Sequence, residues 1–444
     1  MENQGDIVSE SVQPITVSRP EHTISRANIS SSALKVLYRL KEAGFQSFLV
    51  GGGVRDLLLG REPKDFDVST NAHPDEVRKL FRNARLIGRR FRLAHVRYGR
   101  DIIEVATFRA RHDPDSSDGE TGAHSDEGRI LRDNVYGDIE DDVWRRDFTV
   151  NALYYDIRDF SIVDYVNGLE DLKSGTLRVI GDPEQRYRED PVRMLRAVRF
   201  ATKLGFRIDA DSEKLLWELG YLLEDIPAAR LYEEVMKLFL GGCALSTFEL
   251  LRHCDLFRYL FPHTDAVLAG EEQGFPITFV SRALENTDVR LAEGKPVTPA
   301  FLYAALLWEP MRKQARELEA GGSSALEAMQ VAGNNMVSQQ AGYTSLPKRF
   351  SFPMREIWNL QPRLERRRGK APFRTLEHPR FRAAYDFLLL RTEVGEASTE
   401  LAEWWTEFQE RNPNNRSHMV EAAPKRRKRR HRPRKRKPAA ASDD

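Results

Sequence analysis

The sequence predicts an α+β protein in which a small mixed sheet near the N-terminus is followed by a long all-α region. Short strand-like runs alternate with helical patterns up to about residue 170, which is typical of a small sheet covered by helices. From Asp171 onward, amphipathic helical patterns follow one another without strands. Residues 425–444 contain eleven Lys or Arg and two Asp, a composition that predicts a disordered basic tail.

The N-terminal part contains the first strands. Residues 1–30 are polar and lack periodicity, so they are predicted to be disordered. A serine-rich start and leucines at helical spacing predict a helix over 31–45. The run "QSFLVGGG" (46–53) predicts a short buried strand that leads into a glycine turn, and "VRDLLLG" (54–60) predicts a helical turn ended by its glycine.

The next elements complete the sheet. We expect a strand at "KDFDVST" (64–70), a helix at "HPDEVRKLFR" (73–82) and a hairpin formed by "HVRYG" and "DIIEVATFR" (95–109). Residues 111–130 are polar and acidic, and they predict a mobile loop. Two further runs, within 145–168, predict another strand pair.

Helical patterns fill the remainder to about residue 410. The clearest ones cover 191–206, 212–226, 228–242 and 244–257. We therefore divide the chain into a disordered start (1–30), an α/β domain (31–170), a first helical domain (171–265), a second helical domain (266–415) and a disordered basic tail (416–444).

Composition excludes several classes of protein. No apolar run approaches the roughly 18 residues that a membrane-spanning helix needs, and the polar N-terminus lacks a signal-peptide core. Cys243 and Cys254 do not have the spacing of a zinc site or a disulfide framework, so we expect a cytoplasmic protein. The whole chain has a net charge of only +2, so the body before the tail is mildly acidic. The tail is expected to bind phosphates, although a solubilising role is the alternative.

The segment "GGGVRDLLLGREPKDFDVST" (51–70) combines a glycine cluster with two carboxylates. In a strand, Asp65 and Asp67 project from one face while Phe66 points to the core. Adjacent carboxylates repel each other, and a divalent cation such as Mg²⁺ relieves the repulsion. The glycines would let backbone N–H groups approach a phosphate. The alternative is an ordinary solvated pair of strand residues.

A metal site would need a third carboxylate, for which there are two candidates. Glu104 lies in the apolar run "IIEVA", where a charge is costly unless it is paired or bound to a metal. Asp147 follows Arg145 and Arg146 in "RRDFTVNAL", and its alternative role is an internal salt bridge. Asn151 would share the face of Asp147 if this stretch were helical.

Taken in order, "LVGGGVRDLLLG", "KDFDVST", "RRDFTVNAL" and "REDPVRMLRAVRFATKLGF" resemble the successive motifs of the class II nucleotidyltransferases. This family, part of the polymerase-β superfamily, comprises the bacterial poly(A) polymerases and the tRNA CCA-adding enzymes. The resemblance covers about residues 35–265. It implies a polymerase-β-like nucleotidyltransferase head over 31–170 and a helical neck over 171–265 that contacts the base and RNA.

The resemblance also implies roles for individual residues. It implies that Asp65 and Asp67 bind two Mg²⁺ ions, with Mn²⁺ as a substitute. Asp147 is similar to a further catalytic carboxylate or ribose-binding residue. The residues implied to bind the nucleotide are Gly51, Gly52, Arg55, Asp56, Arg146, Asn151, Glu189, Asp190, Arg193 and Arg196. Among them, Glu189, Asp190 and Arg193 resemble the Glu-Asp-x-x-Arg motif that recognises the incoming base.

The pattern around this last motif agrees with such a role. Asp190 before Pro191 is a favourable N-cap and first-turn pair. Arg193, Arg196 and Arg199 then recur every three residues as a basic stripe, whose alternative interpretation is a solvated helix face. A carboxylate and a guanidinium together can recognise the donor and acceptor edges of a base.

Three regions resemble the poly(A) polymerase branch of the family more than the CCA-adding branch. These are "LIGRRFRLAHV" (86–96), "HPRFRAAYDFLLLR" (378–391) and the basic tail. The patch "LERRRGKAPF" (364–373) adds cations and Phe373 as a stacking surface for RNA. The expected activity is template-independent transfer of AMP from ATP to RNA 3′ ends, with RNA-decay proteins as partners. The alternatives are CCA addition to tRNA and an RNA-binding protein built on an inactive transferase scaffold.

Overall fold

The computed structural model describes residues 13–88, 92–110, 135–271 and 279–420, together with the backbone of 122–124 and 130–133. Most of the predicted loop 111–130 and nearly all of the basic tail therefore lie outside the described residues. The chain divides into two compact units. Unit 1 comprises Met1–Pro310 and Asn335–Ser351, and unit 2 comprises Met311–Asn334 and Phe352–Asp444. The predicted boundary at residue 266 falls inside unit 1.

Unit 1 begins with a mixed eight-stranded sheet in the order β1-β10-β9-β2-β3-β6-β5-β4. Strands β3 and β6 run parallel, and every other neighbouring pair in this sheet runs antiparallel. The predicted α+β class with a small mixed sheet is confirmed. The strands are β1 (Ile15–Val17), β2 (Ser47–Val50), β3 (Asp67–Thr70), β4 (Ala84–Ile87), β5 (Leu93–Tyr98), β6 (Asp101–Thr107), β9 (Leu153–Asp156) and β10 (Ile162–Asp164). Two smaller pairs join β7 (Gly122–His124) to β8 (Ile130–Asp133) and β11 (Thr176–Leu177) to β12 (Arg207–Ile208).

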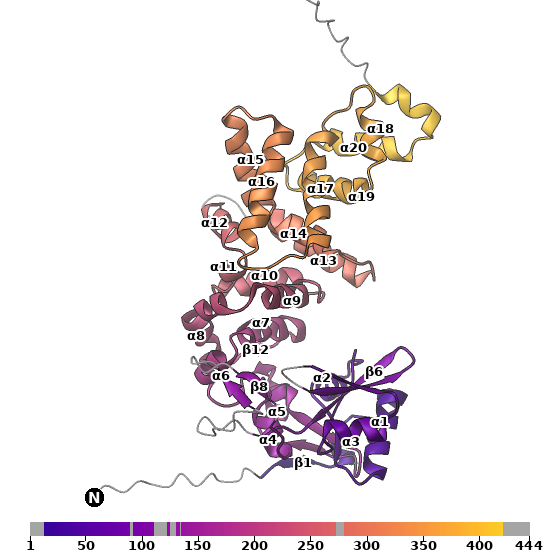
Figure 1. Cartoon of the computed structure of the whole chain (residues 1–444), viewed down its shortest axis with the longest axis vertical. Helices are drawn as coiled ribbons and strands as arrows, with labels where there is room; N and C mark the ends of the chain where they lie inside the picture. The colour runs from indigo at the N-terminus through magenta and orange to yellow at the C-terminus, as the bar shows by residue number, and fades with distance from the viewer. Residues whose placement is uncertain are drawn as a thin grey trace, which may run out of the picture. The chain divides into compact units, whose positions relative to one another are not determined.

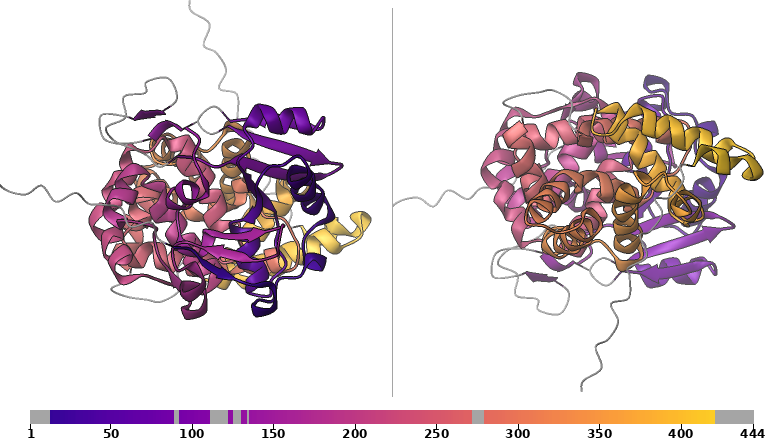
Figure 2. Two further views of the ribbon diagram at one scale, coloured as in Figure 1. Left: turned by 90° about the horizontal axis from the view of Figure 1, so that it is seen from below. Right: turned by 90° about the horizontal axis from the view of Figure 1, so that it is seen from above.

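Helices cover both faces of the central strands (Figure 1, Figure 2). On one face, Val36 and Leu37 of α1 and Val77 of α3 pack against Leu49 and Val68 of the sheet. On the other face, a second cluster joins the sheet to α4. Strand β2 is consequently buried along its whole length, as its continuous apolar run predicts. The helices of this region are α1 (Ser31–Glu42), α2 (Gly52–Leu58), α3 (Pro74–Leu80), α4 (Ile139–Trp144) and α5 (Gly168–Ser174).

Two predictions for this region were wrong in part. Residues 13–30 are ordered, because β1 pairs with β10 and because Ile24 and Ile29 are buried in the core beneath α1. Their polar composition concealed these two anchoring side chains. The strand predicted at 64–70 begins only at Asp67, so Asp65 precedes the strand in an exposed connection. Phe66 nevertheless packs against the core, as expected.

The rest of unit 1 is helical, and the four clearest predicted helices are present as α7 to α10. The helices are α6 (Pro183–Glu189), α7 (Val192–Leu204), α8 (Ala210–Leu219), α9 (Ala228–Phe239), α10 (Ala244–His253), α11 (Phe257–Leu260), α12 (Pro262–Glu271), α13 (Phe279–Ala292) and α14 (Pro299–Leu306). In the described part of the chain, we find no helix that is long and apolar enough to cross a membrane.

The remaining helices belong mainly to unit 2. They are α15 (Trp308–Ala320), α16 (Ala325–Gln340), α17 (Lys348–Leu364), α18 (Ala371–Leu376), α19 (Phe381–Glu393) and α20 (Thr399–Glu410), followed by the 3₁₀ helix η5 (Pro413–Met419). The buried Trp405 donates a hydrogen bond to the carbonyl of Leu364 (2.8 Å). Phe373 packs edge-on against Phe408 and the core, so it is not the free stacking surface that we expected. Residues 416–420 are ordered, whereas the predicted tail began at 416.

Candidate active site

Three carboxylates gather where the parallel strands β3 and β6 lie side by side. Asp67 opens β3 and is in register with Glu104 of β6, and Asp65 lies just before the strand. We call Asp65, Asp67 and Glu104 the acidic corner. Burial, the charge of Glu104 and, to a smaller extent, the charge of Asp65 together raise the pKa of Asp67 to about 6, although Arg146 opposes them. The corner therefore holds more negative charge than its surroundings neutralise.

Glu104 does not lie in the environment that the sequence predicted. Its side chain is 49% exposed, and it makes a 3.1 Å contact with the ring Nε2 of His95 on β5. Ile102, on the same face of β6, is also exposed. This face of the strand is open to solvent, so a charge is tolerated there without a metal or a buried partner.

The glycine turn between β2 and α2 closes against this corner. Gly51 has a φ of 71°, a conformation that side-chain-bearing residues rarely adopt. A Cβ at Gly51 would lie 3.5 Å from Nη1 of Arg146 and 3.9 Å from Oδ2 of Asp67. At Gly53, a Cβ would lie 3.4 Å from the carbonyl oxygen of Asp65. Because these glycines have no side chains, the backbone of the turn lies close to the carboxylate of Asp67 and to the main chain at Asp65.

Arg146 connects the sheet to α4 beside the acidic corner. Its guanidinium donates hydrogen bonds to the hydroxyls of Tyr154 (2.7 Å) and Ser69 (3.0 Å), and to the carboxylate of Asp142 (3.0 Å). Burial alone would lower the pKa of Arg146, but Tyr154 and Asp142 raise it above its ordinary value. Arg146 is therefore a fixed positive charge close to Asp67.

Asp147 belongs to a different set of contacts. Its carboxylate accepts hydrogen bonds from Nε (2.8 Å) and Nη2 (2.5 Å) of Arg196, and from Nδ2 of Asn151 (3.2 Å). Burial opposes ionisation, but Arg196 overcomes this effect and lowers the pKa of Asp147 to about 2. The salt bridge that was the alternative for Asp147 is present, with Arg196 as the partner in place of its sequence neighbours. The carboxylate that lies next to Asp67 is therefore that of Glu104, not that of Asp147.

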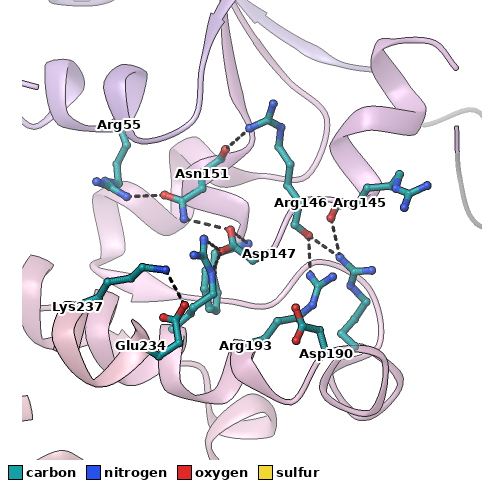
Figure 3. Close-up of polar contacts among 12 residues, drawn as sticks. Arg55, Arg145, Arg146, Asp147, Asn151, Asp190, Arg193, Glu234 and Lys237 are labelled. Carbon is teal, nitrogen blue, oxygen red and sulfur yellow. Dashed lines mark hydrogen bonds and ion pairs between the residues drawn. The ribbon is translucent and has the colours of Figure 1, made fainter. Parts of the chain in front are cut away.

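Asn151 extends this set of contacts toward the glycine turn. Its Oδ1 accepts a hydrogen bond from Nη1 of Arg55 (2.5 Å) (Figure 3). Arg55 is buried and forms an ion pair with Asp56 (2.7 Å). Asn151 ends a short 3₁₀ helix, Thr149–Asn151, so it approaches Asp147 by a tight turn and not by an α-helical spacing.

The Glu-Asp-x-x-Arg residues are also paired. Glu189 accepts a hydrogen bond from Arg186 (2.7 Å) and lies 4.0 Å from Arg193. Both carboxylate oxygens of Asp190 accept from Nη2 of Arg230 on α9 (2.9 Å each). Asp190 therefore contacts a neighbouring helix and does not cap α7 as predicted.

We call these paired residues the arginine network. Its members are Arg55, Asp147, Asn151, Arg186, Glu189, Asp190, Arg193, Arg196 and Arg230. Sequence reasoning missed Arg186 and Arg230. Arg186 stands three residues before Glu189, a helical spacing that could have identified it. Arg230 is 40 residues from Asp190 and carries no local signal.

Family models match most of the chain. Residues 47–178 match the "Poly A polymerase head domain", residues 205–268 match the "Probable RNA and SrmB-binding site of polymerase A", and residues 321–438 match the "Polymerase A arginine-rich C-terminus". The chain is 49% identical to poly(A) polymerase I of Escherichia coli O6:H1 over 435 residues, which are 96% of this chain and 93% of that protein. The chain belongs to the poly(A) polymerase family.

Other members and neighbours agree with this assignment. Poly(A) polymerase I of Haemophilus influenzae is 45% identical over 96% of both chains. A CCA-adding enzyme of Lactobacillus helveticus is 39% identical, but over only 50% of this chain. A structure of the Bacillus stearothermophilus CCA-adding enzyme in complex with CTP has a TM-score of 0.57 at 26% identity and covers 85% of this chain and 81% of that one. The poly(A) polymerase family thus shares its architecture with CCA-adding enzymes.

Nucleotidyltransferases of this kind use divalent metals, and the acidic corner fits such an ion. Its carboxylates include Asp67, whose pKa is raised by burial and by the charge of Glu104, and a bound cation would favour the ionised form. Within the described ranges, no group of three or more His, Cys, Asp or Glu side chains is already arranged as a metal cluster. Glu104 is turned toward His95, so it would have to leave that contact to join Asp65 and Asp67.

Proposed function

We propose that this chain transfers AMP from ATP to the 3′-hydroxyl of RNA without a template and releases pyrophosphate. The observation that supports this most strongly is the 49% identity to poly(A) polymerase I over nearly the whole of both chains. The acidic corner beside the glycine turn supplies the chemistry that such a reaction needs, because carboxylates and backbone atoms of the turn lie close together there.

Asp65 and Asp67 are the proposed metal ligands, and Glu104 is the proposed third carboxylate. When bound, two Mg²⁺ or Mn²⁺ ions would favour ionisation of the attacking hydroxyl and neutralise the charge of the leaving pyrophosphate. The raised pKa of Asp67 and its register with Glu104 support this choice. Asp147 is instead proposed to hold Arg196 in place, because its carboxylate is already bound by that guanidinium.

The nucleotide would lie between the glycine turn and the arginine network. Gly51 and Gly52 would bring backbone N–H groups toward the triphosphate. Arg55 and Asp56, held together as an ion pair, would shape the same pocket with Arg146 and Asn151. Glu189, Asp190, Arg193 and Arg196 would contact the base and ribose. Asp190 and Arg193 offer an acceptor and a donor, which together can distinguish bases.

RNA 3′ ends are the proposed second substrate, bound through phosphates with little sequence preference. The matches to an RNA-binding model over 205–268 and to an arginine-rich C-terminus over 321–438 support this proposal. The basic tail contributes eleven Lys or Arg within 425–444. We also propose a cytoplasmic location and partners among the proteins of RNA decay.

CCA addition to tRNA is the competing function, because half of the chain is 39% identical to a CCA-adding enzyme. An incorporation assay with each nucleoside triphosphate and a short RNA distinguishes the two. We expect long A tracts from ATP. Incorporation of CTP into tRNA that lacks its 3′ end, without A tracts on other RNA, would overturn the proposal. An Asp65→Ala variant is the matched negative control.

A further inference from the structure

A cavity of about 400 Å³ lies between Lys64, which precedes Asp65 of the acidic corner, and the neck helices. It is lined by the connection before β3 and by residues of α7, α9 and the turn that precedes α10. Four of its lining residues are cationic, namely Lys64, Arg199, Lys203 and Lys237. None of them is among the residues to which we assign ATP binding.

The positive charge of this cavity is only partly compensated. Lys237 is paired with the buried Glu234 (2.7 Å) (Figure 3). The side chains of Lys64, Arg199 and Lys203, in contrast, have no hydrogen-bond or ion-pair partner among the residues that the structure describes. Three carboxylates act on the lining residues, because Glu234 and Asp147 lie near Arg199 and Asp288 lies near Cys243. The four cations still outnumber them, and an excess of positive charge favours an anionic ligand.

Arg199 is the most informative of these cations. Its Nε is buried without a hydrogen-bond partner, and its guanidinium lies over the ring of Phe200, 4.4 Å from the centroid. The Nε of Arg193 is also buried without a partner, but its guanidinium lies 4.0 Å from Glu189 and donates to the carbonyl of Arg146. Arg196 is bound to Asp147, so Arg199 differs from both in having no acceptor for its guanidinium among the described residues. A partly buried guanidinium without an acceptor is costly. An anion in the cavity would remove that cost.

We propose that this cavity binds backbone phosphates of the acceptor RNA next to its 3′ end. The proposal rests on the proposed function, and two features favour RNA over the triphosphate of ATP. Lys64 directly precedes Asp65, so a strand held here would lead into the acidic corner. Met236, Leu238 and Leu240 line the rest of the cavity, and apolar walls suit sugars and bases better than a compact inorganic anion.

The first test removes two cations from the cavity of the full-length protein. In a Lys64→Gln/Lys203→Gln double variant, we expect the Kd for an RNA oligomer, measured by fluorescence anisotropy without metal, to rise on the order of tenfold. The salt dependence of binding should fall by about 1.4 in slope, at about 0.7 for each lost phosphate contact. Lys295→Gln, an exposed lysine of unit 1 outside the cavity, is the matched control.

The KM for ATP should stay unchanged in the double variant. The proposal is wrong if RNA affinity equals that of the control, or if the KM for ATP rises as much as the Kd for RNA. Binding without metal needs no catalysis. A wild-type protein that binds RNA through these lysines but adds no AMP would therefore refute the proposed function and leave the RNA site supported.

Cys243 offers a second, independent test because it lines the same cavity. The other cysteine, Cys254, is fully buried, and burial raises the pKa of its thiol to about 12, so it should react slowly. We expect an RNA oligomer to slow maleimide labelling of Cys243 in the wild type, with less protection in the double variant. Equal protection by metal-free ATP or by pyrophosphate would identify a nucleotide phosphate site, and no protection by RNA would also overturn the proposal.

Discussion

The acidic corner and the arginine network lie in the same unit but differ in how their carboxylates are neutralised. In the arginine network, Asp147 and Asp190 are each held by a guanidinium at 2.9 Å or less. In the acidic corner, Asp67 faces Glu104 and Asp65, and its pKa is raised to about 6. In the arginine network the carboxylates are paired within the protein, whereas the acidic corner retains a surplus of negative charge that suits a cation from solution.

This difference separates two tasks of a nucleotidyltransferase. Paired charges resist movement, so the arginine network can position groups that contact the nucleotide. Crowded carboxylates are unfavourable in the metal-free protein, yet they supply the oxygen ligands that divalent ions prefer. The comparison therefore predicts that substitutions in the two regions have opposite effects on stability.

The largest effect is expected from Asp67→Asn, which removes charge from the acidic corner. AMP incorporation should fall on the order of 10³-fold, because an amide binds divalent metal poorly. The folded-state pKa of Asp67 is raised, so its ionisation disfavours folding above about pH 6, and that cost is absent below its ordinary pKa. The melting temperature at neutral pH should therefore stay equal or rise. A clear loss of stability would break the comparison.

Arg196→Ala tests the opposite expectation in the arginine network. It leaves the largely buried Asp147 carboxylate without its guanidinium, and we expect a loss of about 2 kcal/mol in the free energy of unfolding. The double variant with Asp147→Asn should recover part of this loss, because the unpaired charge is gone. Chemical denaturation of the wild type, the two single variants and the double variant measures the cycle. Additive losses would show that the two residues do not act as a pair.

Arg230→Ala sharpens the comparison at the residues that we propose to contact the base. Without Arg230, Asp190 loses the donor that holds both of its oxygens. We expect the KM for ATP to rise on the order of tenfold while the affinity for RNA is unchanged. Steady-state kinetics and anisotropy measure the two quantities. Arg230→Lys, which keeps the charge, is the control and should lose less.

The smallest effect concerns the pH dependence of metal binding at the acidic corner. Only ionised Asp67 is a good ligand, and its pKa lies at about 6 in the metal-free protein. Between about pH 7 and about pH 5.5, the apparent affinity for Mn²⁺ should fall roughly fourfold through this group. Calorimetric titration measures it, with Asp67→Asn as the reference. A pH-independent affinity would exclude Asp67 as a ligand.

Much of the fold was predictable, because its signals are local. The buried run at 46–53 and the four helical patterns after residue 190 correspond to β2 and to α7–α10. The anchoring of residues 13–30 was not predictable, since it depends on pairing between β1 and β10, far apart in the chain. Glu104 was assigned to a costly apolar position because strand periodicity does not show which face of β6 is open to solvent.

The sequence by itself determined the order of the elements, the glycine turn before Asp65 and Asp67, and membership of a family. These features are encoded by residues that are neighbours along the chain. Only the tertiary structure decided the pairing, namely that Asp147 meets Arg196, that Asp190 meets Arg230 and that Arg55 meets Asn151. Polar side chains form hydrogen bonds and ion pairs when they are close in space. These partners are 40 to 96 residues apart in the sequence, so no local spacing pattern predicts their contacts.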